Sequence, residues 1–208
     1  MGKTTLAQLV FNDVLVKNQF QLKIWVCVSD PFDEIKIAKA ILEVTNRSCS
    51  SLTQPQALLQ SIEKSISGQK FLLVLDDVWE DDDSKWRPLK ACLKNGAPGS
   101  RILVTTRKTK VAKIMGTTYI HMLEPLSDSY CWSILSHRAL EGRGEADHEI
   151  LKETGLEIAK KCKGLPLAAN IVGGLLHCKA SLQEWQDVLD SEIWELEEMR
   201  KGFILRCR

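Results

Sequence analysis

An unbroken apolar run at residues 71–75 (FLLVL) is followed at once by two carboxylates, Asp76 and Asp77. None of its positions alternates to a polar residue, which is typical of a strand buried on both faces of a parallel sheet. A buried helix segment gives the same pattern over so short a length, so the run alone does not separate the two. If the run is a strand, both aspartates lie at its carboxyl end, where ligands bind in open α/β sheets.

Shorter apolar runs alternate with helical periodicities on both sides of this segment. The pattern predicts further strands at residues 24–28, 101–106 and 119–122. It predicts helices at residues 4–12, 33–44, 58–66, 86–93 and 111–115. Strands that alternate with helices on this scale indicate βαβ units and a mostly parallel sheet.

The pattern changes after Pro125, where helices follow one another without a strand. Their markers are a cap at Ser127, an apolar periodicity over about residues 148–163, a helix start at Pro166, and a capping box from Ser181 to Glu184. We therefore predict a sheet-containing subdomain at residues 1–125, a small all-helical subdomain at 126–196, and an atypical tail at 197–208.

Composition places the chain among ordinary globular proteins, with 208 residues, 44% of them hydrophobic and 26% charged. The net charge of +1 argues against a dedicated nucleic-acid or membrane surface. No apolar run has the length of a membrane span, and no signal-peptide pattern is present. The seven cysteines are scattered without a C-x-x-C pair, which favours reduced thiols and a cytoplasmic location over disulfides or a zinc site. The four histidines match no catalytic pattern.

The first residues of the chain carry a second candidate for chemistry. Gly2, Lys3, Thr4 and Thr5 match the second half of a phosphate-binding loop, G-x-x-x-x-G-K-[ST]. In such a loop the glycine lets the backbone approach the phosphates, the lysine reaches the β- and γ-phosphates, and the Ser/Thr hydroxyl ligates Mg²⁺. Four residues alone recur by chance. Their combination with a distant apolar strand that ends in two aspartates is a much stronger indication.

Tandem aspartates at a strand end suit this chemistry. They can hold a hydrated Mg²⁺ and orient a water molecule near a phosphate. The alternative is a polar loop start, because aspartate is also a common turn and cap residue.

Five motifs occur in a fixed order along the chain: GKTTLAQ (2–8), WVCVSDPFD (25–33), LLVLDDVW (72–79), GSRILVTTR (99–107) and CKGLPLA (162–168). Together they resemble the NB-ARC domain of plant disease-resistance proteins, the nucleotide-binding, leucine-rich-repeat immune receptors. The resemblance extends from Gly2 to about residue 196, and Trp79 after LDDV resembles the coiled-coil branch of these receptors. It implies a P-loop NTPase-type parallel sheet followed by a helical ARC subdomain.

The resemblance also implies roles for the residues at the start of the chain. Gly2 would belong to the phosphate-binding loop and Lys3 would neutralise phosphate charge. Thr4 would ligate Mg²⁺, and Thr5 would hydrogen-bond an inner phosphate.

Four further residues receive roles in the same way. Asp76 would hold Mg²⁺ through water, and Asp77 would position the hydrolytic water. Arg107 would sense the terminal phosphate, with a solvated surface arginine as the alternative. Pro166 would pack near the adenine, although a plain helix-start proline explains the residue type equally well.

The function implied by the resemblance is an ADP/ATP switch of an intracellular immune receptor. ADP would be bound at rest and exchanged for ATP on activation, with slow Mg²⁺-dependent hydrolysis as the reset. The partners would be the nucleotide and the coiled-coil and leucine-rich-repeat domains of the receptor, with oligomerisation on activation. Two alternatives stay open: an ATPase or kinase with real turnover, and a truncated fragment that acts only as a protein-interaction module.

One departure from the family pattern leads to expectations about the sheet. The family has a strand before its phosphate-binding loop, placed between the strands at 71–75 and 101–106, and this sequence starts after it. We therefore expect a truncated fragment, poorly stable alone, with a gap or strained pairing between these two strands, because buried unpaired backbone groups cost roughly 1–3 kcal/mol each. Direct closure of the two strands would move the Lys3 loop off the strand ends.

Overall fold

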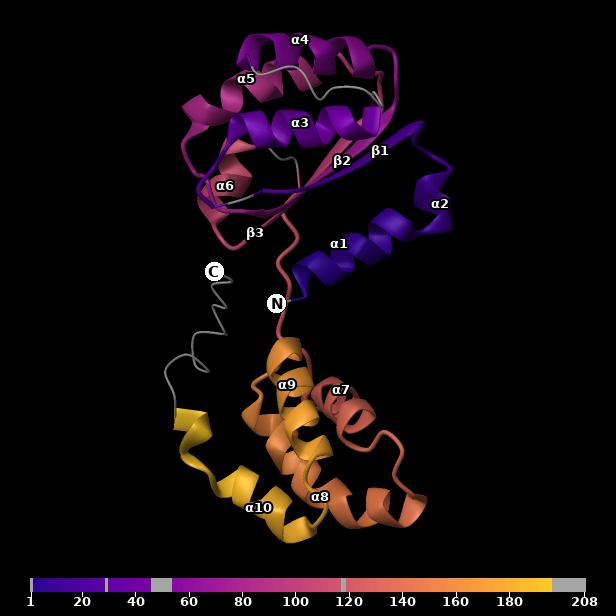
Figure 1. Cartoon of the computed structure of the whole chain (residues 1–208), viewed down its shortest axis with the longest axis vertical. Helices are drawn as coiled ribbons and strands as arrows, with labels where there is room; N and C mark the ends of the chain where they lie inside the picture. The colour runs from indigo at the N-terminus through magenta and orange to yellow at the C-terminus, as the bar shows by residue number, and fades with distance from the viewer. Residues whose placement is uncertain (1, 29, 46–53, 117–118, 196–208) are drawn as a thin grey trace. The chain divides into compact units, whose positions relative to one another are not determined.

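The computed structural model of the chain describes residues 2–28, 30–45, 54–116 and 119–195, so the predicted tail at 197–208 lies outside the described residues (Figure 1). The chain divides into two compact units. The first runs from Lys3 to His121, and the second holds Gly2 together with the helices that follow Met122.

Three parallel strands form the sheet of the first unit, in the order β1-β2-β3. They are β1 (Leu22–Cys27), β2 (Phe71–Val78) and β3 (Arg101–Thr106). The apolar run at residues 71–75 is the central strand and is buried throughout. The predicted α/β class, with a parallel sheet and flanking helices, is confirmed.

Helices cover both faces of this sheet. They are α1 (Lys3–Asn12), α2 (Val14–Lys17), α3 (Glu34–Thr45), α4 (Pro55–Ile66), α5 (Asp83–Leu93) and α6 (Thr109–Ile114). Figure 1 shows α3, α4 and α5 on one face and α1 on the other. Phe71, Leu73 and Leu75 pack into the larger core, whereas Leu72 and Val74 pack with Ala7 of α1. The unbroken apolar run follows from this arrangement, because successive side chains of a strand point to opposite faces.

The direct pairing of β2 with β3 contradicts the gap expected between these strands. Leu72 to Leu75 pair in register with residues 101–104, and Val78 pairs with Thr106. The register shifts between these two stretches, so that Asp76 and Asp77 together face Thr105. Two residues opposite one define a β-bulge, which bends the strand and disrupts the ladder only locally. The expected gap is therefore wrong, whereas the alternative expected with it, an irregular pairing, corresponds to the register shift between Leu75 and Val78.

Two local predictions also need correction. Residues 119–122 do not form the predicted strand. Tyr119 is 76% and Met122 70% exposed, so these side chains are not buried against a sheet. Helix α2 was missed. The carboxylate of Asp13 accepts the backbone N–H groups of Leu15 and Val16, and this N-cap starts a new helix directly after α1.

The second unit is helical, as expected from the pattern after Pro125. Its elements are α7 (Asp128–Ala139), α8 (Glu145–Lys161), α9 (Pro166–His177), α10 (Leu182–Asp190) and a 3₁₀ helix, η1 (Glu192–Glu195). The cap at Ser127, the helix start at Pro166 and the capping box from Ser181 to Glu184 are confirmed. The core of this unit centres on the fully buried Trp185 and Leu135.

Candidate functional site

The bulge in β2 places the two aspartates differently. Asp76 is 4% exposed, and its backbone carbonyl accepts the N–H of Val28 at 2.9 Å. Asp77 is exposed and has a φ of 55°, in the left-handed region that few residues other than glycine adopt. Aspartate is among the residues that enter this region most readily. The tandem sequence therefore gives one buried carboxylate and one that faces solvent.

The hydroxyl of Thr105 connects the two aspartates across the bulge. It donates to Asp76 Oδ1 at 2.5 Å and accepts the backbone N–H of Asp77 at 2.9 Å. Thr105 is itself 7% exposed. It was absent from the sequence-based candidates. The only signal for it was a polar residue near the end of a strand, and the register that brings it to Asp76 cannot be read from the sequence.

The start of α1 reaches the same point. The Thr4 hydroxyl donates to Asp76 Oδ1 at 3.0 Å, so that two hydroxyls share one carboxylate oxygen. The expectation that direct closure of β2 on β3 would move the Lys3 loop off the strand ends is therefore wrong. The N-terminal turn of a helix also presents backbone N–H groups without intrahelical partners, which favour anions.

Gly2, Lys3 and Thr5 flank Thr4 in the sequence. Gly2 precedes the helix with a φ of 87°, a conformation that suits glycine. Lys3 is the first residue of α1 and is half-buried, and Thr5 is exposed on the same first turn. Thr4 is the member of this group that the structure joins directly to Asp76.

Arg107 follows the end of β3 and is exposed. Its guanidinium lies over the ring of Trp79, 5.5 Å from the ring centroid, in a cation–π arrangement. Trp79 follows the end of β2, so this contact links the loops after the two strands that carry the site. Sequence reasoning assigned Trp79 no part in the site.

Pro166 belongs to the second unit. It is the first residue of α9, directly after the N-cap Leu165. A missing N–H and a fixed φ suit this position, so local structure accounts for a proline here.

The donor set at Asp76 suits Mg²⁺. In proteins this ion is usually held by one or two carboxylates, with water and substrate phosphates in the other positions. Asp76 supplies one carboxylate and Thr4 a hydroxyl beside it. Among the residues the structure describes, no three His, Cys, Asp or Glu side chains gather to hold a metal. One carboxylate beside a hydroxyl suits a metal that is bound together with a phosphate.

The acidic stretch after Trp79 is held by lysines and an arginine. Glu80 pairs with Lys85 at 2.5 Å, and Asp83 pairs with Arg87 and Lys90. The hydrogen bond from Lys108 lowers the pKa of Asp81 below its ordinary value. These contacts pair the acidic side chains of this stretch with neighbouring cations.

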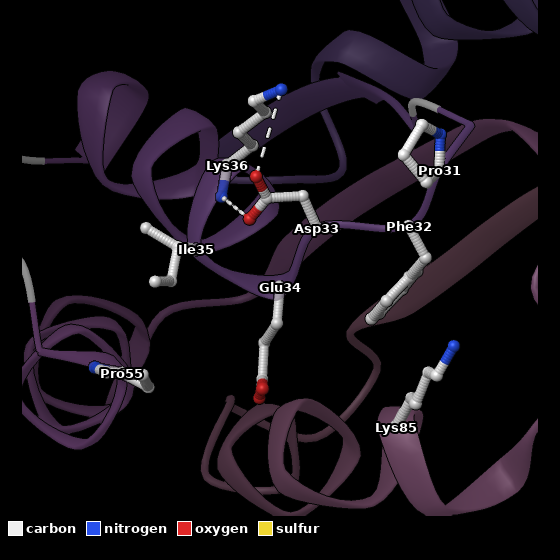
Figure 2. Close-up of a pocket in the computed structure, with 8 residues that line it drawn as sticks. All are labelled: Pro31, Phe32, Asp33, Glu34, Ile35, Lys36, Pro55 and Lys85. Atoms are coloured by element: carbon white, nitrogen blue, oxygen red, sulfur yellow. Dashed lines mark hydrogen bonds and ion pairs between the residues drawn. The ribbon is translucent and has the colours of Figure 1, made fainter.

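A separate hollow of about 440 Å³ opens beside the start of α3 (Figure 2). It is lined by Pro31, Phe32, Asp33, Glu34, Ile35, Lys36, Pro55 and Lys85. Asp33 pairs with Lys36, and Figure 2 shows Lys85 of α5 across from Phe32. None of the residues predicted to bind nucleotide lines this hollow.

A parallel sheet, a helix start that carries Gly-Lys-Thr, and a buried aspartate at the adjoining strand end define a nucleotide-binding domain of the P-loop type. The NB-ARC domain family matches residues 1–145. The chain therefore belongs to the NB-ARC family.

Relatives in two plants match nearly the whole chain. The putative disease resistance protein RGA1 of Solanum bulbocastanum is 44% identical over 208 residues, which cover 100% of this chain and 21% of the relative. A putative disease resistance RPP13-like protein 1 of Arabidopsis thaliana is 40% identical over 199 residues, which cover 94% of this chain and 19% of the relative. The chain thus spans about a fifth of the length of these relatives. Among the described residues, no helix combines the length and apolar character that crossing a membrane requires.

Proposed function

We propose that this chain is the ADP/ATP-binding switch module of a plant immune receptor, located in the cytoplasm. The observation that carries the proposal is the hydrogen bond from Thr4 to Asp76. It joins the phosphate-binding end of α1 to the carboxyl end of β2, and these are the two parts that P-loop proteins use to hold Mg²⁺ and nucleotide.

Each site residue has a role in this proposal. Lys3 and the N–H groups at the start of α1 bind the phosphates, with Thr5 on the same turn. Thr4 and Asp76 hold Mg²⁺, which neutralises phosphate charge when bound. The exposed carboxylate of Asp77 orients the water that attacks the terminal phosphate, and its solvent-facing position at the bulge supports that role.

Two residues would give the switch its response to the nucleotide. Arg107 stands past the end of β3 on the face of Trp79, and an arginine there can leave the ring for a terminal phosphate. Pro166, at the start of α9, would close the site over the adenine. The partners proposed are the coiled-coil and leucine-rich-repeat domains of the receptor, with oligomerisation on activation.

Calorimetric titration of the chain with ADP, in the presence and absence of Mg²⁺, tests the proposal. We expect saturable binding that Mg²⁺ strengthens and that Lys3→Ala abolishes. A folded chain that does not bind ADP under either condition would favour the protein-interaction alternative.

A further inference from the structure

One hydroxyl, that of Thr105, is bonded to both aspartates of the candidate site. It donates to Asp76 Oδ1 at 2.5 Å and accepts from the Asp77 backbone N–H at 2.9 Å. An ionised carboxylate only accepts and an N–H only donates, so both partners fix the orientation of this hydroxyl. Its single proton must point to Asp76 and a lone pair to Asp77.

The β-bulge creates the need for this hydroxyl. Where two residues face one, the ladder leaves a backbone group of the extra residue without its usual partner. Here Asp76 and Asp77 face Thr105, and the side chain of Thr105 takes the N–H of Asp77 in place of a ladder carbonyl. The same contact holds Asp77 in its left-handed conformation, with a φ of 55°.

The bond to Asp76 fixes how that carboxylate is presented. Thr4 and Thr105 approach the same oxygen, Oδ1, from two different elements of the fold. With Oδ1 held twice, the carboxylate has one orientation and Oδ2 stays open to a metal or to a metal-bound water. Groups that orient metal ligands in this way tune metal affinity although they never touch the metal.

We infer that Thr105 is a positioning residue: its hydroxyl sets the orientation of Asp76 and the backbone of Asp77, and thereby the Mg²⁺-dependent part of nucleotide binding. The inference rests on the proposed function, because it concerns the same site. It goes beyond that function by naming a residue outside the proposed set of nucleotide and metal ligands that controls how strongly Mg²⁺ supports binding.

Three substitutions separate positioning from a merely structural role. Thr105→Val keeps the shape of the side chain and removes the hydroxyl, whereas Thr105→Ser keeps the hydroxyl. Thr106→Val is the matched control on the same strand, since the Thr106 hydroxyl donates to the carbonyl of Val78 and does not bond to Asp76. If Thr105→Val does not fold, Thr105→Ala is used instead, because alanine also lacks the hydroxyl and does not add the second methyl group of valine.

The measurement is calorimetric ADP affinity with and without Mg²⁺, on variants whose folding is checked by circular dichroism. Thr105→Val should lose about 10–100-fold in affinity with Mg²⁺ and less than about twofold without it. Thr105→Ser should recover most of the Mg²⁺ effect, and Thr106→Val should retain it. In an Asp76→Asn background, Thr105→Val should cause no further loss of the Mg²⁺ effect.

The outcomes distinguish the inference from the function on which it rests. If the parent binds ADP with Mg²⁺ and Thr105→Val shows the same Mg²⁺ effect, the positioning role is wrong and the proposed function stands. An equal loss with and without Mg²⁺ also overturns it, because that loss reports damaged structure. A parent chain that binds no ADP refutes the proposed function, and the inference falls with it.

Discussion

The hydroxyl of Thr4 lies 3.0 Å from Oδ1 of Asp76, a residue 72 positions further along the chain. This contact brings together the first turn of α1 and the end of β2, the two places where the sequence carries phosphate and metal chemistry. A hydroxyl that donates its proton to a carboxylate keeps its lone pairs for a cation. The contact therefore supports both the phosphate-binding and the metal-binding parts of the proposed site.

Lys3→Ala should abolish ADP binding without unfolding the chain. Lys3 is half-buried at the first position of α1 and belongs to none of the buried apolar clusters, so its replacement by alanine should remove phosphate contacts rather than core packing. Calorimetry with ADP and far-UV circular dichroism give the two readouts. Lys17→Ala, an exposed lysine at the end of α2, is the matched control and should bind as the parent does. Equal ADP affinity in Lys3→Ala and the parent would contradict the role given to Lys3.

Asp76→Asn should reduce Mg²⁺-dependent ATP hydrolysis by roughly 10²-fold or more and reduce ADP binding far less. The amide oxygen can still accept the hydroxyls of Thr4 and Thr105, so the local structure should persist. The missing charge matters most where phosphate charge develops during the reaction. Phosphate release over hours, beside calorimetry with ADP, compares the two effects. Asp187→Asn on α10 serves as the control, and unchanged hydrolysis in Asp76→Asn would count against a metal-binding role.

The parts of this fold that depend on local pattern were predictable from the sequence. The strand at residues 71–75 was predicted from its apolar run together with the alternation of strand and helix patterns around it, and the capping box at Ser181 from two residues three apart. Pairing between distant segments does not have such a signal. The direct contact of β2 with β3, and the bulge that brings Thr105 to Asp76, depend on register over long sequence separation. A one-residue difference in register changes which side chains meet.

Asp77→Gly should leave the chain more stable than Asp77→Ala does. Both remove the carboxylate, and both should lose ATP hydrolysis if Asp77 orients the attacking water. The φ of 55° is natural for glycine, whereas alanine pays roughly 1–2 kcal/mol in the left-handed region. Urea denaturation should therefore show the glycine variant to be the more stable of the two by about that amount. Equal stability of the two variants would show that the left-handed conformation at Asp77 is not maintained in solution.

Cysteine labelling should separate the buried from the exposed thiols. Burial raises the pKa of Cys92 to about 11 and that of Cys162 to about 12, and it also raises the pKa of Cys131. At pH 8 the Cys162 thiol is then ionised in only about one molecule in ten thousand, and the thiolate is the reactive form. Iodoacetamide followed by peptide mass spectrometry should mark the exposed Cys27 and Cys178 and spare the buried Cys92, Cys131 and Cys162 until urea is added. Rapid native labelling of Cys162 would contradict the packing of the helical unit.

Two neighbouring glycines in α9, Gly173 and Gly174, offer a test of how that unit is packed. A Cβ atom at Gly173 would lie 2.9 Å from the backbone oxygen of Leu135 in α7, whereas one at Gly174 would meet nothing within 4 Å. A backbone atom cannot move aside as a flexible side chain can, so Gly173→Ala must push α7 and α9 apart. Overpacking of this kind costs typically about 1–3 kcal/mol.

Gly174→Ala raises the helix propensity of α9 as Gly173→Ala does, but its added methyl group meets no other atom within 4 Å. It should stabilise the chain by about 0.5–1 kcal/mol, because glycine in a helix interior loses more backbone entropy on folding than alanine does. Urea denaturation monitored by circular dichroism should therefore shift to lower concentration for Gly173→Ala and to higher concentration for Gly174→Ala. Since the two sites are adjacent on one helix, a shift in the same direction for both would mean that α7 does not lie against α9 at Gly173.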